Sequence, residues 1–125
     1  KGERIMVIDD EASILAMTQA TLTNFGYVVS TAASGMEAIT RFRENPDAFG
    51  LVITDQIMPL LDGHATVTAL RKIRPNLKII VASGCFEKEA EEQFRDFRVQ
   101  GFISKPYSTE KLLSIVSEVL AGKDK

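Results

Sequence analysis

The fold is decided near the start of the chain, where residues 4–11 read Arg4-Ile5-Met6-Val7-Ile8-Asp9-Asp10-Glu11. Four consecutive apolar residues indicate a strand that is buried on both faces, as in a parallel sheet. Asp9 and Asp10 follow this strand directly, and carboxylates beside a buried strand carry an electrostatic cost that packing does not offset. The pair taken alone could equally be a solvated helix start, because Asp is favoured at helix N-caps. The rest of the chain must decide between that interpretation and a cation site.

Apolar, β-branched runs recur along the chain, and each is followed by a stretch of helical length. They predict five strands, at about residues 4–8, 27–31, 51–54, 78–83 and 101–104. The alternation predicts an α/β fold, a doubly wound five-stranded parallel sheet with helices on both faces. The common order for such a sheet is the flavodoxin-like 2-1-3-4-5, and the least apolar strand, 27–31, suits an edge.

Helix boundaries are marked by local signals. Ser34 is followed three residues later by Glu37, the spacing of a capping box at a helix start. Asn45-Pro46 and Arg74-Pro75 are expected to end helices, because proline disfavours helical backbone in the residue before it.

The composition favours one globular domain over residues 1–125, with 45% hydrophobic and 26% charged residues. The formal net charge of -2, without a basic stripe, disfavours direct nucleic-acid binding. Cys85 is the only cysteine, which excludes an internal disulfide or a cysteine-based zinc site and fits a cytoplasmic location. No apolar run approaches the ~20 residues that span a bilayer, so we expect no membrane contact. Lys1 in place of Met suggests an excised or processed segment.

Polar residues stand at the carboxyl ends of four predicted strands. Asp55 ends the third strand, Ser83 the fourth and Lys105 the fifth, and these ends meet at one edge of a parallel sheet. Together with Asp9 and Asp10 they are expected to share a shallow cleft. Like charges 4 Å apart repel by about 4 kcal/mol at an effective dielectric of ~20, so three carboxylates favour a divalent cation.

The chemistry of this set points to phosphoryl transfer. Ligands that are only oxygens select a hard ion, and few carboxylates suit Mg²⁺ better than Ca²⁺. A lysine and a hydroxyl beside an aspartate can neutralise phosphoryl oxygens, and the aspartate can itself be the nucleophile.

Four motifs then identify a resemblance to the receiver domains of two-component response regulators. They are RIMVIDDE at 4–11, ITDQIMPLLDG at 53–63, IIVASG at 79–84 and GFISKP at 101–106, and they span essentially the whole chain. The resemblance implies a domain that accepts a phosphoryl group from a histidine on a kinase or histidine phosphotransfer partner. It also implies self-catalysed transfer and autodephosphorylation rather than conventional enzymatic turnover.

Metal-binding and acceptor roles follow from the same resemblance. Asp55 resembles the phosphoacceptor, Asp10 a direct Mg²⁺ ligand and Asp9 a ligand acting largely through water. The carbonyl of Ile57 would be the third protein ligand.

The resemblance also implies a switch. Lys105 resembles the lysine that pairs with the acceptor or its phosphoryl group, and Ser83 the hydroxyl that turns inward to bind a phosphoryl oxygen. Phe102 occupies the switch-aromatic position, and the Lys105-Pro106 bond is expected to be cis.

Two positions depart from the best-known members of the family. Ile57 and Cys85 stand where residues tune the lifetime of the phosphoryl group, and neither side chain orients water well. We expect Ile57 and Cys85 to slow hydrolysis of the acyl phosphate. Cys85 is expected to have a tuning or packing role rather than a redox role, because no basic cluster surrounds it.

Aromatic residues concentrate around the fourth helix and fifth strand: Phe86, Phe94, Phe97, Phe102 and Tyr107. Most are expected to be core, although the resemblance implies that the fourth helix, fifth strand and fifth helix can serve homodimerisation or partner docking. His64, the sole histidine, is expected early in the third helix as a surface residue.

Two other functions compete with the receiver. A Mg²⁺-dependent phosphatase with an aspartyl intermediate, of the haloacid dehalogenase type, would want a second Asp two residues after the nucleophile, whereas Asp9 and Asp10 are adjacent. A degenerate receiver would only bind partners, but every phosphorylation residue is present. The lead-in Gly2-Glu3-Arg4 and the Ala82-Ser83-Gly84 stretch resemble receivers of hybrid histidine kinases, so the parent chain can be such a kinase.

Overall fold

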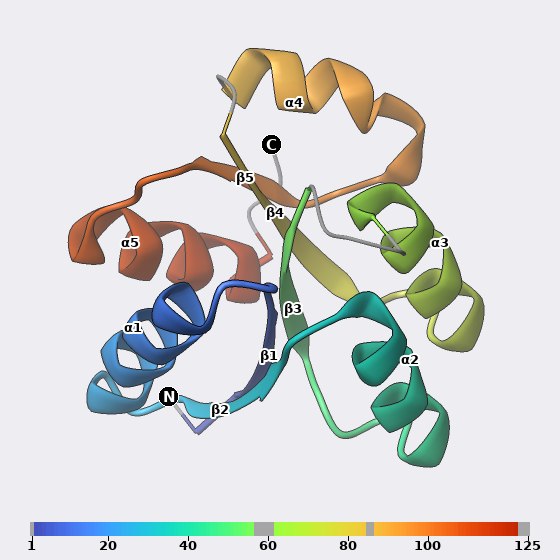
Figure 1. The fold of residues 1–125 in the computed structure, drawn as a ribbon, viewed down its shortest axis with the longest axis horizontal. Helices are drawn as coiled ribbons and strands as arrows, with labels where there is room; N and C mark the ends of the chain where they lie inside the picture. Colours follow the sequence, from blue (N-terminus) through green and yellow to red (C-terminus); the bar gives the residue numbers. More distant parts are fainter. Residues whose placement is uncertain (1, 57–61, 85–86, 123–125) are drawn as a thin grey trace.

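The structure is a computed structural model that describes residues 2–56, 62–84 and 87–122 (Figure 1). Its elements in chain order are β1 (Arg4–Ile8), α1 (Ala12–Asn24), β2 (Val28–Ala32), α2 (Gly35–Glu44), β3 (Leu51–Asp55), α3 (Gly63–Ile73), β4 (Lys78–Ser83), α4 (Glu87–Gln93), the 3₁₀ turn η1 (Arg95–Phe97), β5 (Gly101–Ser104) and α5 (Thr109–Leu120).

The five strands form one sheet in the order β2-β1-β3-β4-β5, and every pairing is parallel. The predicted fold class and strand order are therefore confirmed, and β2 is an edge strand as expected. β2 begins at Val28 rather than at Tyr27. The reason is local: the Tyr27 N–H donates to the Leu22 carbonyl in the turn that follows α1, which keeps Tyr27 out of the ladder.

Alternate residues of the strands feed two separate cores. Met6, Ile8 and Val52 pack on one face against apolar side chains of α2, α3 and α4. Ile5 and Val7 pack on the opposite face, against side chains of α1 and α5. Figure 1 shows this division, with α1 and α5 on one side of the sheet and α2 and α3 on the other. Because both faces are covered, the continuous apolar runs of β1, β3 and β4 are buried, as the sequence predicts.

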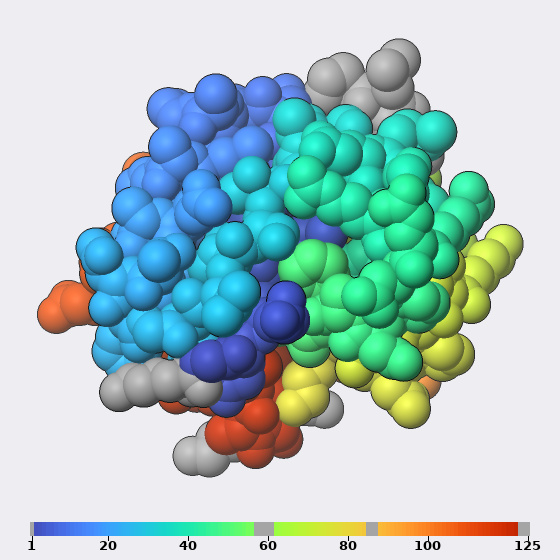
Figure 2. All heavy atoms as spheres, turned by 90° about the horizontal axis from the view of Figure 1, so that it is seen from below, coloured from blue at the N-terminus to red at the C-terminus, as the bar shows by residue number. Residues whose placement is uncertain are grey.

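The end of the sheet opposite its carboxyl edge is seen from below in Figure 2. The dark-blue residues at the start of the chain lie between the lighter-blue segment that leads into β2 and the green segment that enters β3. This placement agrees with a β1 strand that pairs with β2 on one side and β3 on the other. In the ranges that the structure describes, no helix has the length and apolarity needed to cross a membrane.

The helix boundaries follow the signals in the sequence. Ser34 caps α2 by accepting a hydrogen bond from the Glu37 N–H at 3.1 Å. The Glu37 carboxylate accepts from the Ala33 N–H rather than from Ser34 itself, so the expected box is closed one residue early. α2 ends just before Asn45-Pro46 and α3 just before Arg74-Pro75, as predicted.

A buried hydrogen bond ties α1 to the segment between β5 and α5. The hydroxyls of Thr18 and Tyr107 lie 2.7 Å apart, and both side chains are buried. The same segment contains Lys105 and Pro106, and the bond between them is cis, which confirms the expectation. Burial, the largest influence, raises the pKa of Tyr107 above its ordinary value of 10.0.

Replacing Tyr107 with Phe should therefore change how stability depends on pH. A group whose pKa is raised by folding contributes stability that is present below its unfolded pKa and is lost as pH rises through its folded pKa. The free energy of unfolding of the wild type should thus fall more steeply above about pH 10 than that of Tyr107→Phe. At neutral pH the variant should lose about 1–3 kcal/mol, because the Thr18 hydroxyl stays buried without its partner. Urea unfolding at several pH values measures both effects, and parallel pH profiles would contradict the assignment to Tyr107.

Candidate functional site

Three aspartates meet at the carboxyl edge of the sheet. Asp9 follows β1, Asp10 comes next, and Asp55 is the last residue of β3. One carboxylate oxygen from each of the three lies within 4.8 Å of the others. Asp9 is 2% exposed and Asp55 8%, whereas Asp10 is exposed to solvent. The structure therefore brings together the acidic residues that the sequence singled out.

Lys105 reaches into this acidic cluster from the end of β5. Its Nζ lies 2.8 Å from Asp9 Oδ2 and 3.2 Å from Asp55 Oδ1, and the side chain is only 16% exposed. Burial alone would lower the pKa of Lys105, but its hydrogen bond to Asp9 and the charge of Asp55 together raise that pKa above the ordinary value. Lys105 is therefore a cation at neutral pH, and it offsets part of the repulsion among the carboxylates.

Glu11 is a neighbour that the sequence analysis did not include. Its carboxylate lies 3.8 Å from Lys105 Nζ, and its backbone N–H donates to Asp9 Oδ1 at 2.9 Å. Both oxygens of Asp9 thus already accept a hydrogen bond, one from Glu11 and one from Lys105. The motif that contains Asp9 ends in Glu11, so the signal was present in the sequence.

The cluster fits a hard divalent cation. Its donor atoms are all carboxylate oxygens, which suit Mg²⁺, and the exposure of Asp10 leaves room for the waters that Mg²⁺ usually keeps. Ile57, whose carbonyl was expected to be a further ligand, lies outside the described residues. So does Cys85, and the two expected tuning positions are therefore not placed.

Ser83, the last residue of β4, is 2% exposed, and its Oγ donates to Oε1 of Gln56 at 2.5 Å. The backbone carbonyl of Ser83 also accepts a hydrogen bond from the Lys105 N–H at 2.7 Å. The ends of β4 and β5 are therefore joined at the site.

Gln56 is the principal site residue that the sequence analysis missed. It follows Asp55, is only 9% exposed, and its Nε2 donates to Oε1 of Gln93 at the end of α4. A polar amide directly after a buried strand and before the apolar Ile57 and Met58 was the available signal. Its partner on α4 could not be inferred from that signal.

His64 is half-buried at the surface, where it makes aromatic contacts that the sequence did not predict. It lies early in α3, beside Gly63, and its ring stacks on Phe94 with centroids 4.0 Å apart and planes 3° from parallel. It also meets Phe97 edge-on at 5.1 Å, and its Nε2 lies 3.0 Å from the Gln93 carbonyl oxygen. The first turn of α3 faces the end of α4, which the sequence pattern of α3 alone does not reveal.

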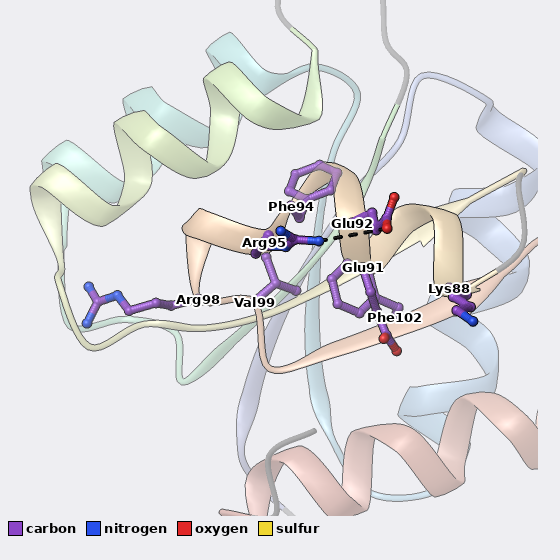
Figure 3. Close-up of a pocket in the computed structure, with 8 residues that line it drawn as sticks. All are labelled: Lys88, Glu91, Glu92, Phe94, Arg95, Arg98, Val99 and Phe102. Carbon is purple, nitrogen blue, oxygen red and sulfur yellow. Dashed lines mark ion pairs between the residues drawn. The ribbon is translucent and has the colours of Figure 1, made fainter.

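Phe102 is buried in β5, and its ring centroid lies 6.2 Å from that of Phe94. Figure 3 shows both rings in a groove between α4 and β5, together with Val99. Charged side chains border this groove: Lys88, Glu91, Glu92, Arg95 and Arg98. Phe102, the expected switch aromatic, thus lies beside α4, the helix whose Gln93 bonds to the Gln56 side chain.

Comparison with known proteins finds similarity over nearly the whole chain. The sequence model of the response regulator receiver domain matches residues 5–117. The chain is 32% identical over 120 residues to the sensor kinase CckA of Brucella abortus, which covers 96% of this chain and 13% of CckA. It is 30% identical over 120 residues to the chemotaxis protein CheY of Thermotoga maritima, covering 94% of this chain and 98% of that protein.

Solved structures show the same similarity. The chemotaxis protein CheY4 of Vibrio cholerae superposes with a TM-score of 0.87 at 28% identity, covering 95% of this chain and 99% of that one. The chain spans 13% of the length of CckA and about half the length of the transcriptional regulators named ycf27 that it matches.

A substitution at Gly63 should disturb the site through the backbone. A Cβ at this position would lie 2.8 Å from the Asp55 carbonyl oxygen and 2.9 Å from Cα of Gln56. Backbone atoms cannot move aside cheaply, so Gly63→Ala should cost about 1–3 kcal/mol of unfolding free energy, the usual penalty of overpacking.

Urea unfolding measures this loss, and Gly84→Ala is the matched control, because a Cβ at Gly84 would meet nothing within 4 Å. Equal stability of the two variants would show that the approach of α3 to β3 is not tight.

Proposed function

This chain belongs to the response regulator receiver family, and on that premise we propose that Asp55 accepts a phosphoryl group from a phosphohistidine. One observation carries the proposal: the Asp55 carboxylate is nearly buried beside a lysine cation and within 4.8 Å of two further carboxylates. A domain of two-component signalling needs this combination, because an acceptor carboxylate must be held close to positive charge while phosphate arrives.

The transfer step is a displacement at phosphorus. An Oδ atom of Asp55 attacks, a P–O bond forms, and the P–N bond to the donor imidazole breaks. The imidazole leaves with the electron pair of that bond and takes up a proton. Lys105 is placed to hold an oxygen of Asp55 before the step and a phosphoryl oxygen after it.

Asp9, Asp10 and Asp55, with the proposed Ile57 carbonyl, would hold Mg²⁺. When bound, the ion supplies positive charge that offsets the charge of the phosphoryl oxygens. Asp9 suits a role through water, because Glu11 and Lys105 already donate to its two oxygens.

The switch would respond to charge. A phosphoryl group adds about -1.5 to -2 charge and three acceptor oxygens, which Ser83 and Lys105 would bind. Because Ser83 ends β4 and Lys105 follows β5, their movement would alter the surface around these strands, including the groove beside Phe102.

The proposed donor is a histidine kinase or a histidine phosphotransfer domain. The similarity to part of CckA, a protein named as a sensor kinase, supports a kinase-linked pathway. The groove of Figure 3 supports α4 and β5 as part of the proposed α4, β5 and α5 surface for homodimerisation or partner docking, since its apolar floor has a charged border.

Acetyl phosphate with Mg²⁺ should add one phosphoryl group to the wild type, detected as a mass increase of the intact protein. Asp55→Asn should abolish the adduct, because the amide oxygen is a poor nucleophile. Asp47→Asn, in an exposed turn between α2 and β3, is the matched control and should be phosphorylated normally. A wild type that forms no adduct would favour a degenerate, partner-binding receiver, whereas steady hydrolysis of external phosphoesters would favour a phosphatase.

The lifetime of the adduct should depend on Ile57 and Cys85. We expect the phosphoryl group to be hydrolysed faster in Ile57→Asn and Cys85→Glu than in the wild type, because polar side chains at these positions can orient water. Decay of the phosphorylated mass after removal of acetyl phosphate gives the rates. Met36→Asn, an exposed position on α2, serves as the control. Unchanged or slower decay in both variants would contradict a tuning role.

A further inference from the structure

A row of hydrogen bonds leads from the proposed switch hydroxyl to α4. Ser83 Oγ donates to Oε1 of Gln56, and Nε2 of Gln56 donates to Oε1 of Gln93. The Gln56 amide thus bonds to two elements: its oxygen accepts from β4, and its nitrogen donates to α4. An amide that is only 9% exposed loses these partners at a cost, because water does not readily replace them.

The proton count limits what the Ser83 hydroxyl can donate to. A serine hydroxyl has a single proton to donate, and at 2.5 Å that proton is given to Gln56. A phosphoryl oxygen on Asp55 offers only lone pairs, so Ser83 must donate to it. The hydroxyl cannot donate to both acceptors at once, and binding the phosphoryl group therefore requires that the bond to Gln56 break.

The far end of the row is joined to aromatic packing. The carbonyl oxygen of Gln93 lies 3.0 Å from Nε2 of His64, and the His64 ring stacks on Phe94, the residue after α4. Phe94 in turn contributes to the groove shown in Figure 3, together with Phe102. A change at Gln56 thus reaches the groove through α4, and not only through β5.

We propose that Gln56 is a positioning residue that keeps the Ser83 proton engaged in the unphosphorylated domain and transmits its release to α4 through Gln93. The proposal rests on the proposed function, because release is driven by the phosphoryl group on Asp55. It adds a resting-state restraint: the phosphorylated form must compete with the Ser83–Gln56 bond, and the Gln56 side chain released in that competition is the one that donates to Gln93 on α4.

A double-mutant cycle with acetyl phosphate and Mg²⁺ tests the first half. Gln56→Met, which keeps the side-chain length but cannot accept the proton, should speed adduct formation about two- to ten-fold, the worth of one neutral hydrogen bond. In a Ser83→Ala background the same substitution should have no effect, since no proton remains to be released. Gln19→Met, on the exposed side of α1, is the control and should match the wild type.

Two results would overturn this half of the proposal. One is an unchanged or slower rate in Gln56→Met, and the other is an equal acceleration with and without the Ser83 hydroxyl. The second result would show that Gln56 acts only by packing.

The link to α4 needs a separate readout, for which Gln93→Met is suited because Gln93 is exposed and its loss should spare the fold. Phosphorylation of the wild type should shift the amide NMR signals of α4 and the ring signals of His64 and Phe94. In Gln93→Met these shifts should be reduced by half or more at equal phosphorylation, which intact mass verifies. Full-sized shifts in Gln93→Met would overturn the link.

The mass measurement separates the two levels of inference. A wild type without an adduct at Asp55 would refute the proposed function, whereas an adduct that forms without the expected Gln56 or Gln93 effects would refute only the Gln56 proposal.

Discussion

Repulsion among the carboxylates of Asp9, Asp10 and Asp55 is the constraint on which this site depends. Two such charges at 4 Å cost about 4 kcal/mol at an effective dielectric of ~20, a large share of the stability of a small domain. Lys105 offsets part of this repulsion, since its ammonium lies within hydrogen-bonding distance of Asp9 and Asp55. Lys105 thus limits the repulsion in the unphosphorylated domain. Any additional negative charge on Asp55 forces a new arrangement of the groups around it.

The sequence contains most of this arrangement because a parallel sheet aligns strand ends. Apolar runs located the strands, and once they were placed, Asp55, Ser83 and Lys105 had to meet at one edge. The start of β2 was misplaced by one residue, because Tyr27 bonds to the end of α1, a contact that composition does not reveal.

Contacts between neighbouring helices were harder to predict from the sequence. The stacking of His64 on Phe94 was not predicted, and the partner of Gln56 lies on another helix. Such contacts depend on how α3 and α4 are placed against each other, and periodic patterns within one helix specify only which face is apolar. Sequence reasoning therefore succeeded for residues positioned by the ladder and failed for those positioned by packing between helices.

The two cores on opposite faces of the sheet divide the molecule into parts with different freedom. The stacked rings and the groove belong to the side of α4, a helix of seven residues, whereas the Thr18–Tyr107 bond on the other side ties α1 to the segment that precedes α5. The sheet separates these two cores. A substitution in the α1 and α5 core acts on side chains that are not part of the core beneath α4. The stability of the domain and the shape of the α4 groove therefore depend on largely different side chains.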